Sequence, residues 1–444
     1  MLRVRVHGLS AVLLLLGSTA TARATWSIII IDTRTKEIAV GSATCVSGAD
    51  LKRSVPVVRV GVGAACAQSL VDTSGQNRLL IWNELIRGTD PNEILHLLEA
   101  RDPGHQTRQY GIADVHGRGV TFSGANNGAY AGGLLGRLGT IFYTIQGNVI
   151  TGQPVLLEAE RRLREEPGGI PERLMAAMEG ARSMGGDGRC SCSPKDPTGC
   201  GSPPADFGRT AYIGFILSAR RGDIDDPSCG PGGCAQGEYY MCFNIEGVGP
   251  AARDPVPKLR MMFDEWRLTL VGVPDAIESL VTVDPPLVLN DGGSTATLRI
   301  ELRDYQGLPG TNFTGITLVH DAELGSAGSS TIGPLVDLGG GVFEAQLTAG
   351  TLAGHDRFLI TATYPDDADA DTDEERVLLM PSAELVVQDA RADFNGDGAV
   401  TLEDLALLLE AFGQSDGGDV DGDGDTDLED LALLLGSLPS DGGG

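Results

Sequence analysis

Beyond its first 24 residues, the sequence has no apolar run that approaches the ~20 residues needed to cross a bilayer, so we expect no transmembrane segment there. Basic residues are few, because 33 Lys and Arg stand against 61 Asp and Glu, and the formal net charge is -28. Residues 361–444 alone hold 23 acidic residues and two Arg. This excess disfavours nucleic acid and anionic membranes as partners and suits a divalent cation. Carboxylates paired at a spacing typical of glycoside hydrolases are not recognisable either, which disfavours that reaction.

The first 24 residues have the features of a secretory signal peptide. Basic residues precede an apolar run over 11–16, and Ala22-Arg23-Ala24 supplies the small residues that precede a cleavage site. Cleavage after Ala24 makes Thr25 the N-terminal residue, whereas cleavage after the equally suitable Ala20-Thr21-Ala22 leaves Thr25 third. In either case we predict a protein that is secreted or held at the cell surface.

Thr25 is a candidate nucleophile if it carries a free α-amine. The neutral amine can take the hydroxyl proton while the oxygen attacks a carbonyl, which is how N-terminal-nucleophile hydrolases work. The alternative is that Thr25 is simply the residue with which the exported chain begins. The first domain then is a non-catalytic binding or assembly module.

Eight cysteines in an exported chain predict disulfides. We expect Cys45 to pair with Cys66 inside the first domain. Residues 188–207 are rich in Cys, Gly and Pro and are interpreted as a disulfide-pinned surface insertion. A zinc site there is disfavoured, because Cys190 and Cys192 have C-x-C spacing and no histidine lies near them.

Residues 25–270 predict an α+β domain. The run TWSIIIIDT over 25–33 and the segment 38–44 read as a buried β-hairpin, and amphipathic helices are expected over 77–87 and after Asp90-Pro91. Pairs of helices alternate with blocks of strands that are joined mainly as hairpins. This alternation favours a layered arrangement of helices on sheets.

Several segments in this region resemble, in order, the family called domain of unknown function 1028. They are Thr25-Trp26-Ser27-Ile28, Ala39-Val40-Gly41-Ser42-Ala43, Gly61-Val62-Gly63-Ala64 with Gln68, Arg108-Gln109-Tyr110-Gly111, Phe122-Ser123-Gly124, Gln146-Gly147-Asn148 and Gly185-Gly186-Asp187. That family is similar to the N-terminal-nucleophile hydrolases. The resemblance implies a four-layer αββα sandwich, with Thr25 as nucleophile on the first strand and an amide bond as substrate.

The nucleophile also needs an oxyanion hole and a cation that depresses the pKa of its amine. Lys52 or Arg53 could supply this cation after the second strand, and the alternative is that both are exposed loop charges. An acidic partner for Thr25 is not evident in 41–44.

From about residue 271 the pattern changes to short alternating strands separated by Gly, Pro, Asp and Ser. This spacing is typical of an antiparallel β-sandwich, which we place at 275–388. The segment resembles a bacterial immunoglobulin-like domain. It has no cysteine and no cluster of titratable residues, so a spacer or binding role is expected.

Two acidic loops near the C-terminus have the spacing of calcium-binding EF-hand loops, with oxygen donors at positions 1, 3, 5, 9 and 12, glycine at position 6 and a backbone carbonyl at position 7. The first loop offers Asp393, Asn395, Asp397, Ala399, Thr401 and Asp404, and the second offers Asp419, Asp421, Asp423, Asp425, Asp427 and Asp430. A chance duplication is improbable, so Ca²⁺ is the expected cofactor. Thr401 at position 9 weakens the first site.

Each loop precedes the same helical sequence, LEDLALLL, but no entering helix precedes the first loop. Two such half EF-hands over 391–440 resemble a type I dockerin, a small all-α module that docks secreted enzymes onto cohesin domains. The resemblance implies a cohesin-type or cell-surface scaffold protein as partner. Aspartate at position 12 in place of glutamate fits that family.

Overall fold

The computed structural model describes residues 25–321, 329–365 and 374–438, so the expected signal peptide over 1–24 lies outside the described residues. Contacts within the chain divide it into two compact units. The first comprises the described residues up to Ile31 together with Ile38–Ser218 and Asp225–Leu259. The second comprises Asp32–Glu37, Ala219–Ile224 and the described residues from Arg260 onwards.

A buried β-hairpin opens the first unit. β1 (Thr25–Asp32) contains four consecutive isoleucines, and all its residues are buried. β2 (Ile38–Thr44) pairs with it antiparallel, with Trp26 opposite Ala43. A strand that is covered on both faces needs apolar side chains on both, which explains the continuous apolar run. The hairpin predicted from the sequence is confirmed.

Two sheets form the centre of this unit. The six-stranded sheet has the order β10 (Met241–Ile245), β9 (Ile213–Ala219), β2, β1, β8 (Ile141–Asn148) and β7 (Ala131–Leu138). The four-stranded sheet has the order β3 (Pro56–Arg59), β4 (Gly63–Ser69), β5 (Arg108–Asp114) and β6 (Gly119–Ser123). The sheets face each other, because Ser27 of β1 bonds to Gln68 of β4, and β5 and β6 contact β8 and β7.

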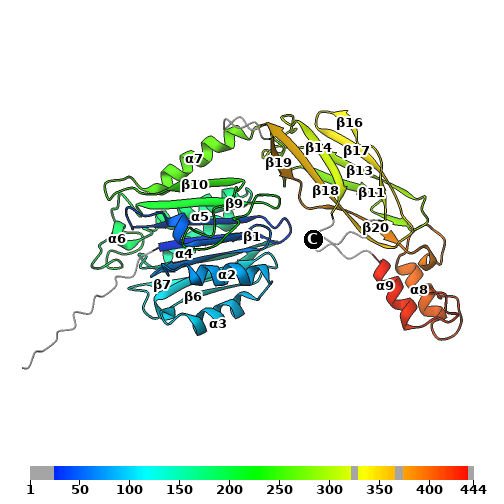
Figure 1. Ribbon diagram of the computed structural model, residues 1–444, viewed down its shortest axis with the longest axis horizontal. Helices are drawn as coiled ribbons and strands as arrows, with labels where there is room; N and C mark the ends of the chain where they lie inside the picture. The colour runs from blue at the N-terminus through cyan, green and yellow to red at the C-terminus, as the bar shows by residue number, and fades with distance from the viewer. Residues whose placement is uncertain (1–24, 322–328, 366–373, 439–444) are drawn as a thin grey trace, which may run out of the picture. The chain divides into compact units, whose positions relative to one another are not determined.

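Helices cover the outer faces of both sheets (Figure 1). α4 (Pro154–Glu165) and α5 (Ile170–Ser183) pack on each other and on the six-stranded sheet, whereas α2 (Gln76–Ile86) and α3 (Pro91–Arg101) pack on the four-stranded one. The unit therefore has four layers in the order helices, sheet, sheet, helices. The remaining elements are α1 (Leu51–Ser54), η1 (His105–Thr107), α6 (Gly188–Ser191) and α7 (Pro255–Thr269), which runs into the second unit.

The second unit contains two packed sheets in the region predicted to be a β-sandwich. One sheet consists of β11 (Leu280–Asp284), β13 (Thr295–Glu301), β17 (Val342–Thr348), β15 (Thr331–Ile332) and β16 (Val336–Gly339). The other consists of β12 (Leu287–Leu289), β20 (Ala383–Gln388), β18 (Gly354–Pro365), β14 (Gly315–His320) and β19 (Glu374–Leu378). Alternate residues of β13 and β18 are buried in a shared apolar core. All the pairings are antiparallel among the described residues except β12 with β20.

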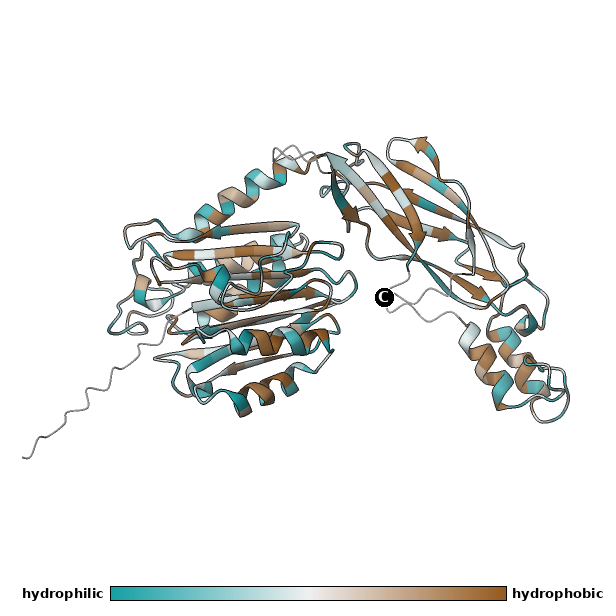
Figure 2. Ribbon diagram, in the orientation of Figure 1, coloured by the Kyte–Doolittle hydropathy of each residue, from teal (hydrophilic) through white to brown (hydrophobic). Residues whose placement is uncertain are grey.

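The acidic repeats form two loop–helix units after β20. η2 (Ala390–Ala392) leads into the first loop, α8 (Leu402–Ala411) follows that loop, and α9 (Leu428–Ser437) follows the second. In Figure 2, α8 and α9 show hydrophobic bands interrupted by hydrophilic ones. Gln388 of β20 is fully buried and attaches both loop–helix units to this strand. Its side chain donates to the carbonyls of Val400 and Ser437 and accepts from the Val400 N–H.

The structure corrects one disulfide prediction. Cys45 pairs with Cys190, not with Cys66, and the other disulfides are Cys192–Cys200 and Cys229–Cys234. Cys66 is a buried free thiol in the middle of β4, where its side chain bonds to Ser27 between the sheets. Cys45 directly follows β2 at the strand end, so it meets the Cys-rich insertion instead. That insertion is held by disulfides, as expected.

Two free thiols are therefore predicted for the unreduced chain, at Cys66 and Cys242. Burial raises the pKa of the Cys66 thiol to about 12, so iodoacetamide at pH 8 should leave it unmodified in the folded protein. Unfolding without reductant should expose both thiols to alkylation. Peptide mapping should also find Cys45 linked to the peptide that contains Cys190, and a Cys45–Cys66 link would contradict the structure.

Candidate functional site

Thr25 and Thr44 lie opposite each other at one end of the first hairpin. β1 begins at Thr25 and β2 ends at Thr44, and the Thr25 hydroxyl donates to the Thr44 hydroxyl across 3.3 Å. Side chains alternate along a strand, so Thr25 and Ser27 lie on the same face of β1. Ser27 bonds to Gln68 of the facing sheet. The candidate nucleophile therefore lies on the side of β1 that faces the second sheet.

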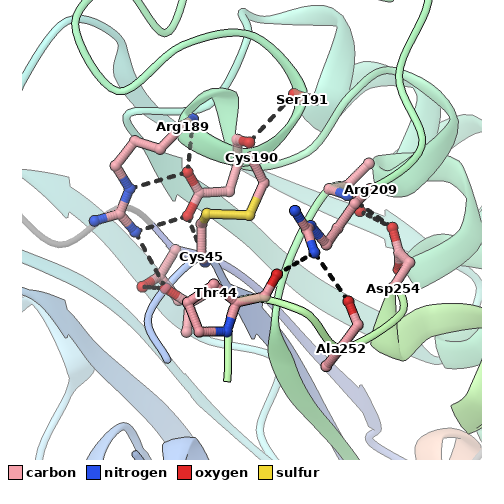
Figure 3. Close-up of a disulfide and its surroundings, with 12 residues drawn as sticks. Thr44, Cys45, Arg189, Cys190, Ser191, Arg209, Ala252 and Asp254 are labelled. Carbon is pink, nitrogen blue, oxygen red and sulfur yellow. Dashed lines mark hydrogen bonds and ion pairs between the residues drawn. A yellow bond between two sulfur atoms is a disulfide. The ribbon is translucent and has the colours of Figure 1, made fainter. Parts of the chain in front are cut away.

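A buried ion pair contacts Thr44. The Asp187 carboxylate is fully buried; its Oδ2 lies 2.8 Å from Nη2 of Arg189, and its Oδ1 lies 3.1 Å from Nε. Figure 3 labels Arg189 and Thr44 beside the Cys45–Cys190 disulfide. The same Nη2 lies 3.5 Å from Thr44 Oγ1. Asp187 also accepts from the Cys45 N–H at 2.6 Å, and the Cys45–Cys190 disulfide joins the two segments. Asp187 balances the charge of Arg189, so the pair brings no net charge to Thr25. Its contribution is the N–H of Arg189, which is directed at the Thr44 hydroxyl beside Thr25.

Buried glutamines hold the backbone of Thr25. Gln68 donates to the Thr25 carbonyl at 3.0 Å and to Oε1 of Gln109 at 2.7 Å. Its own Oε1 accepts from Ser27 at 2.6 Å, and Gln146 donates to the same Ser27 hydroxyl at 2.6 Å. None of these four side chains is more than 1% exposed. These buried hydrogen bonds hold the Thr25 carbonyl and the Ser27 hydroxyl, so they fix the start of β1.

The structure places Lys52 away from these contacts. Its ammonium donates to the carbonyl of Ala235 at 3.0 Å and to the side chain of Gln236 at 3.1 Å. Arg189 is the cation that is linked to Thr25 by hydrogen bonds, because it donates to the Thr44 hydroxyl, which in turn accepts from the Thr25 hydroxyl. Sequence reasoning missed it, because the disulfide that brings its segment to the hairpin joins residues 145 positions apart. The glutamines did carry a signal, since each is a polar residue inside a buried strand.

Asp187 is predicted to be essential for the stability of this site. Replacing it with alanine removes the carboxylate to which Arg189 and the Cys45 N–H donate, and breaking a buried ion pair costs roughly 3 kcal/mol or more. Urea unfolding followed by tryptophan fluorescence should show this loss, since Trp26 and Trp82 lie in the first unit. Asp196→Ala, an exposed position in the same insertion, is the matched control and should change little. An equal effect of the two variants would contradict the role given to Asp187.

The first acidic loop is closed by its own carboxylates. Asp404, at position 12, is fully buried and accepts from the N–H groups of Phe394 at 2.9 Å and Thr401 at 2.8 Å. Asp393, at position 1, accepts from the Gly396 N–H at 2.9 Å. These bonds bring both ends of the loop together around its first carboxylate.

The second loop repeats the same bonds. Asp430 accepts from the N–H groups of Val420 at 2.6 Å and Asp427 at 2.8 Å, and Asp419 accepts from the Gly422 N–H at 2.6 Å. Two loops of different composition thus share one backbone conformation, set by the residues at positions 1 and 12.

Carboxylates converge in the second loop. Ligand oxygens of Asp419, Asp421 and Asp423 lie within 4.8 Å of one another, and so do those of Asp425, Asp427 and Asp430. The negative charge of Asp423, and then that of the other neighbouring aspartates, raises the pKa of the exposed Asp425. In the first loop, Asn395, Ala399 and Thr401 replace three of these carboxylates, so its charge is lower. Clustered oxygen donors of this kind suit Ca²⁺.

Leucines at equivalent positions of α8 and α9 are exposed. Their exposed fractions are 71% for Leu402 and 70% for Leu428, 39% for Leu407 and 42% for Leu433, and 52% for Leu409 and 49% for Leu435. Each helix also buries one leucine in a small shared core, Leu408 in α8 and Leu434 in α9. The repeats therefore present the same apolar positions twice.

None of the helices among the described residues has the length and apolar character needed to cross a membrane.

The comparisons with known proteins bear mainly on the first unit. Residues 25–194 match the model of a family of unknown function, DUF1028, which confirms the resemblance over that range. A DUF1028 protein of Silicibacter pomeroyi is similar in structure over 55% of this chain and 85% of its own, with 18% identity and a TM-score of 0.40. The adhesin InvE of Yersinia pseudotuberculosis is similar over 26% of this chain and 27% of its own, with 22% identity and a TM-score of 0.20. No curated protein matches the chain.

Proposed function

We propose that residues 25–270 form an amide hydrolase of the N-terminal-nucleophile type, with Thr25 as the nucleophile. Removal of residues 1–24 would free the Thr25 α-amine, whose ordinary pKa of about 8 leaves part of it neutral at pH 7. The neutral amine takes the hydroxyl proton while Oγ1 attacks the amide carbonyl. The proton then passes to the departing amine, and water hydrolyses the ester left on Thr25.

The position of Thr25 carries this proposal. It is the first residue of a central strand, its carbonyl is held by Gln68, and its hydroxyl contacts Thr44. A nucleophile must be fixed within a fraction of an ångström to react efficiently, and buried partners supply that fixation. The four layers of the unit agree with the fold that the family resemblance implies.

Mass spectrometry of the exported protein tests the proposal. The mature chain should begin at Thr25, and a β-lactone, which acylates N-terminal nucleophiles, should add to its N-terminal peptide. A chain that begins at Arg23 would make the Thr25 amine an amide and end the proposal. A chain that begins at Thr25 but forms no adduct would favour the non-catalytic binding module.

We further propose that the repeats over 391–438 bind Ca²⁺ and dock the protein to a cohesin-type or cell-surface scaffold. The duplicated loop geometry supports the metal site, and the matching exposed leucines of α8 and α9 support a docking surface. Three disulfides among the described residues support an oxidising, extracellular location.

A purified type I cohesin tests the docking proposal. It should bind the full chain in Ca²⁺ and release it in EGTA, and a Leu402→Asp, Leu428→Asp double variant should bind weakly. Leu352→Asp, at an exposed leucine of the sandwich, is the matched control. Binding that persists in EGTA, or that the double variant retains, would contradict the proposal.

A further inference from the structure

The side chain of Gln388 joins the last strand of the sandwich to the first acidic loop. Gln388 ends β20 and is fully buried. Its Oε1 accepts from the Val400 N–H at 2.8 Å, and its Nε2 donates to the carbonyls of Val400 at 2.8 Å and Ser437 at 2.9 Å. An amide nitrogen has two hydrogens to donate, and two carbonyls receive them. These partners leave the amide one orientation, because turning it over would place its NH₂ group against the Val400 N–H.

Val400 shares a peptide unit with an expected calcium ligand. The Val400 N–H and the Ala399 carbonyl belong to the same peptide bond, and the Ala399 carbonyl is the donor expected at position 7 of the loop. This bond is trans, so the peptide is planar, with its N–H and its carbonyl on opposite sides. The N–H is directed at the buried Gln388. The Ala399 carbonyl is therefore turned away from β20, and the bond to Gln388 keeps it there.

The ends of two paired strands hold Gln388 itself in place. β20 pairs with β12, and Leu289 at the end of β12 lies beside Gln388. The next residue, Asn290, donates its N–H to the Gln388 carbonyl at 2.9 Å, and its side chain accepts from the Ala390 N–H at 2.9 Å. Leu289 also packs against the small core of the repeats. Gln388 thus projects from a strand and not from a free loop, and groups on such elements are placed more precisely.

The second loop is supported differently. Thr426 stands at its position 8, where the first loop has Val400. The Thr426 carbonyl accepts from the Gly413 N–H at 2.9 Å, and the Thr426 hydroxyl accepts from the Gly418 N–H at 3.0 Å. Both glycines lie between α8 and the second loop, so these bonds stay within the repeats. A change at Gln388 should therefore affect the two loops unequally.

We propose that Gln388 is a positioning residue for the first calcium site, so that a strand of the sandwich is part of this site. The inference rests on the calcium binding proposed above and adds the residue that fixes the position 7 carbonyl. The first loop has fewer carboxylates than the second, so a correctly oriented backbone ligand contributes a larger share of its binding. Such coupling is reciprocal: whatever Gln388 adds to the affinity for Ca²⁺, Ca²⁺ adds to the contact between Val400 and β20.

Isothermal titration of the full chain with Ca²⁺ tests the inference. Gln388→Leu keeps the approximate size of the side chain and removes its three hydrogen bonds. Affinity at the first site should fall roughly tenfold, the factor set by ordering one residue's backbone, while the second site should change by less than about threefold. The same titrations in Asp419→Ala and Asp393→Ala backgrounds, each of which disables one loop, assign the two affinities. Gln346→Leu, at an exposed glutamine of β17, is the matched control and should bind like the parent.

Two measurements separate positioning from a general loss of structure. Leu289→Ala weakens packing at the same junction but leaves the Gln388 amide intact, so first-site affinity should stay within about threefold of the parent. In hydrogen exchange, Ca²⁺ should increase protection of the peptide over 383–390 in the parent and not in Gln388→Leu. Unchanged first-site affinity in Gln388→Leu, equal losses at both sites, or an equal loss in Leu289→Ala would overturn the inference and leave the calcium proposal standing. A parent chain that binds no Ca²⁺ would overturn both.

Discussion

Replacing Thr25 with valine is expected to lower the rate of β-lactone labelling at the N-terminus by at least about 10³-fold, since loss of a catalytic nucleophile has effects of this size or larger. Valine keeps the β-branched shape that suits β1 and removes the oxygen that reacts. The readout is the mass of the N-terminal tryptic peptide as a function of labelling time. Intact mass must first show that the variant and the parent both begin at residue 25.

Two further variants separate chemistry from structure. Thr25→Ser keeps the hydroxyl and the amine, so labelling should stay within about tenfold of the parent. Thr331→Val makes the same chemical change at an exposed position of the second unit and should label like the parent. If Thr25→Val labels as fast as the parent, another residue is the nucleophile and the mechanism proposed for Thr25 is wrong.

The sequence was sufficient for the local features of this chain. The isoleucine run of β1 and the small residues of β2 predict the hairpin, because a buried strand pair needs apolar side chains and a short turn between its strands. The alternating strands of the sandwich and the spacing of both acidic loops follow from equally local rules. In each case, the residues that decide the structure lie within about a dozen positions of one another.

The candidate site was harder to predict, because it is assembled from distant segments. Asp187 and Arg189 reach Thr44 only when the chain returns after α5, and the disulfide of Cys45 depends on the same return. The predicted pairing of Cys45 with Cys66 inside the first domain is wrong for a related reason. The alternation of β4 instead turns Cys66 toward Ser27, where Cys45 cannot reach it.

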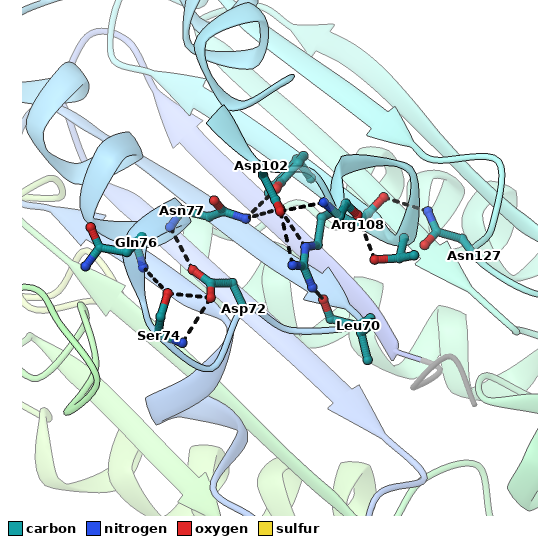
Figure 4. A network of polar contacts seen from close by, with 11 residues as sticks. Leu70, Asp72, Ser74, Gln76, Asn77, Asp102, Arg108 and Asn127 are labelled. Atoms are coloured by element: carbon teal, nitrogen blue, oxygen red, sulfur yellow. Dashed lines mark hydrogen bonds and ion pairs between the residues drawn. The ribbon is translucent and has the colours of Figure 1, made fainter. Parts of the chain in front are cut away.

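The burial of Arg78 in α2 was invisible in the sequence for a related reason. Within the helical pattern of 76–86, an arginine next to leucines reads as a solvent-facing residue that borders an apolar stripe. Its burial depends on α2 packing over β3 and β4, and the Asp72 carboxylate is used by the start of the same helix, where it accepts from the Asn77 N–H (Figure 4). Such a feature appears only when the partners of every neighbouring charge are known.

Removal of Ca²⁺ is expected to unfold residues 391–438 while the first unit stays folded. The buried core of the repeats is small, consisting of Ala392, Val400, Leu408, Val420 and Leu434, and it is surrounded by carboxylates that repel one another. A ligand present at 100 times its dissociation constant stabilises a fold by about 2.7 kcal/mol for each site. For a module of this size, the stabilisation from one site of about 2.7 kcal/mol corresponds to a shift of roughly 10–20 °C in its melting temperature.

Hydrogen exchange of the full chain measures this effect where it occurs. Peptides from α8 and α9 should lose protection in EGTA and regain it with Ca²⁺, whereas peptides from β1 and β8 should not change. Asp419→Ala removes position 1 of the second loop and should lower protection of α9 even in Ca²⁺, and Asp416→Ala, an exposed aspartate outside the ligand positions, should not. Because Asn395 and Thr401 replace carboxylates in the first loop, calorimetry should find a weaker first site and a tighter second one. Protection of α8 and α9 that is the same in EGTA and in Ca²⁺ would show that the acidic loops fold without metal, and the calcium proposal would then fail.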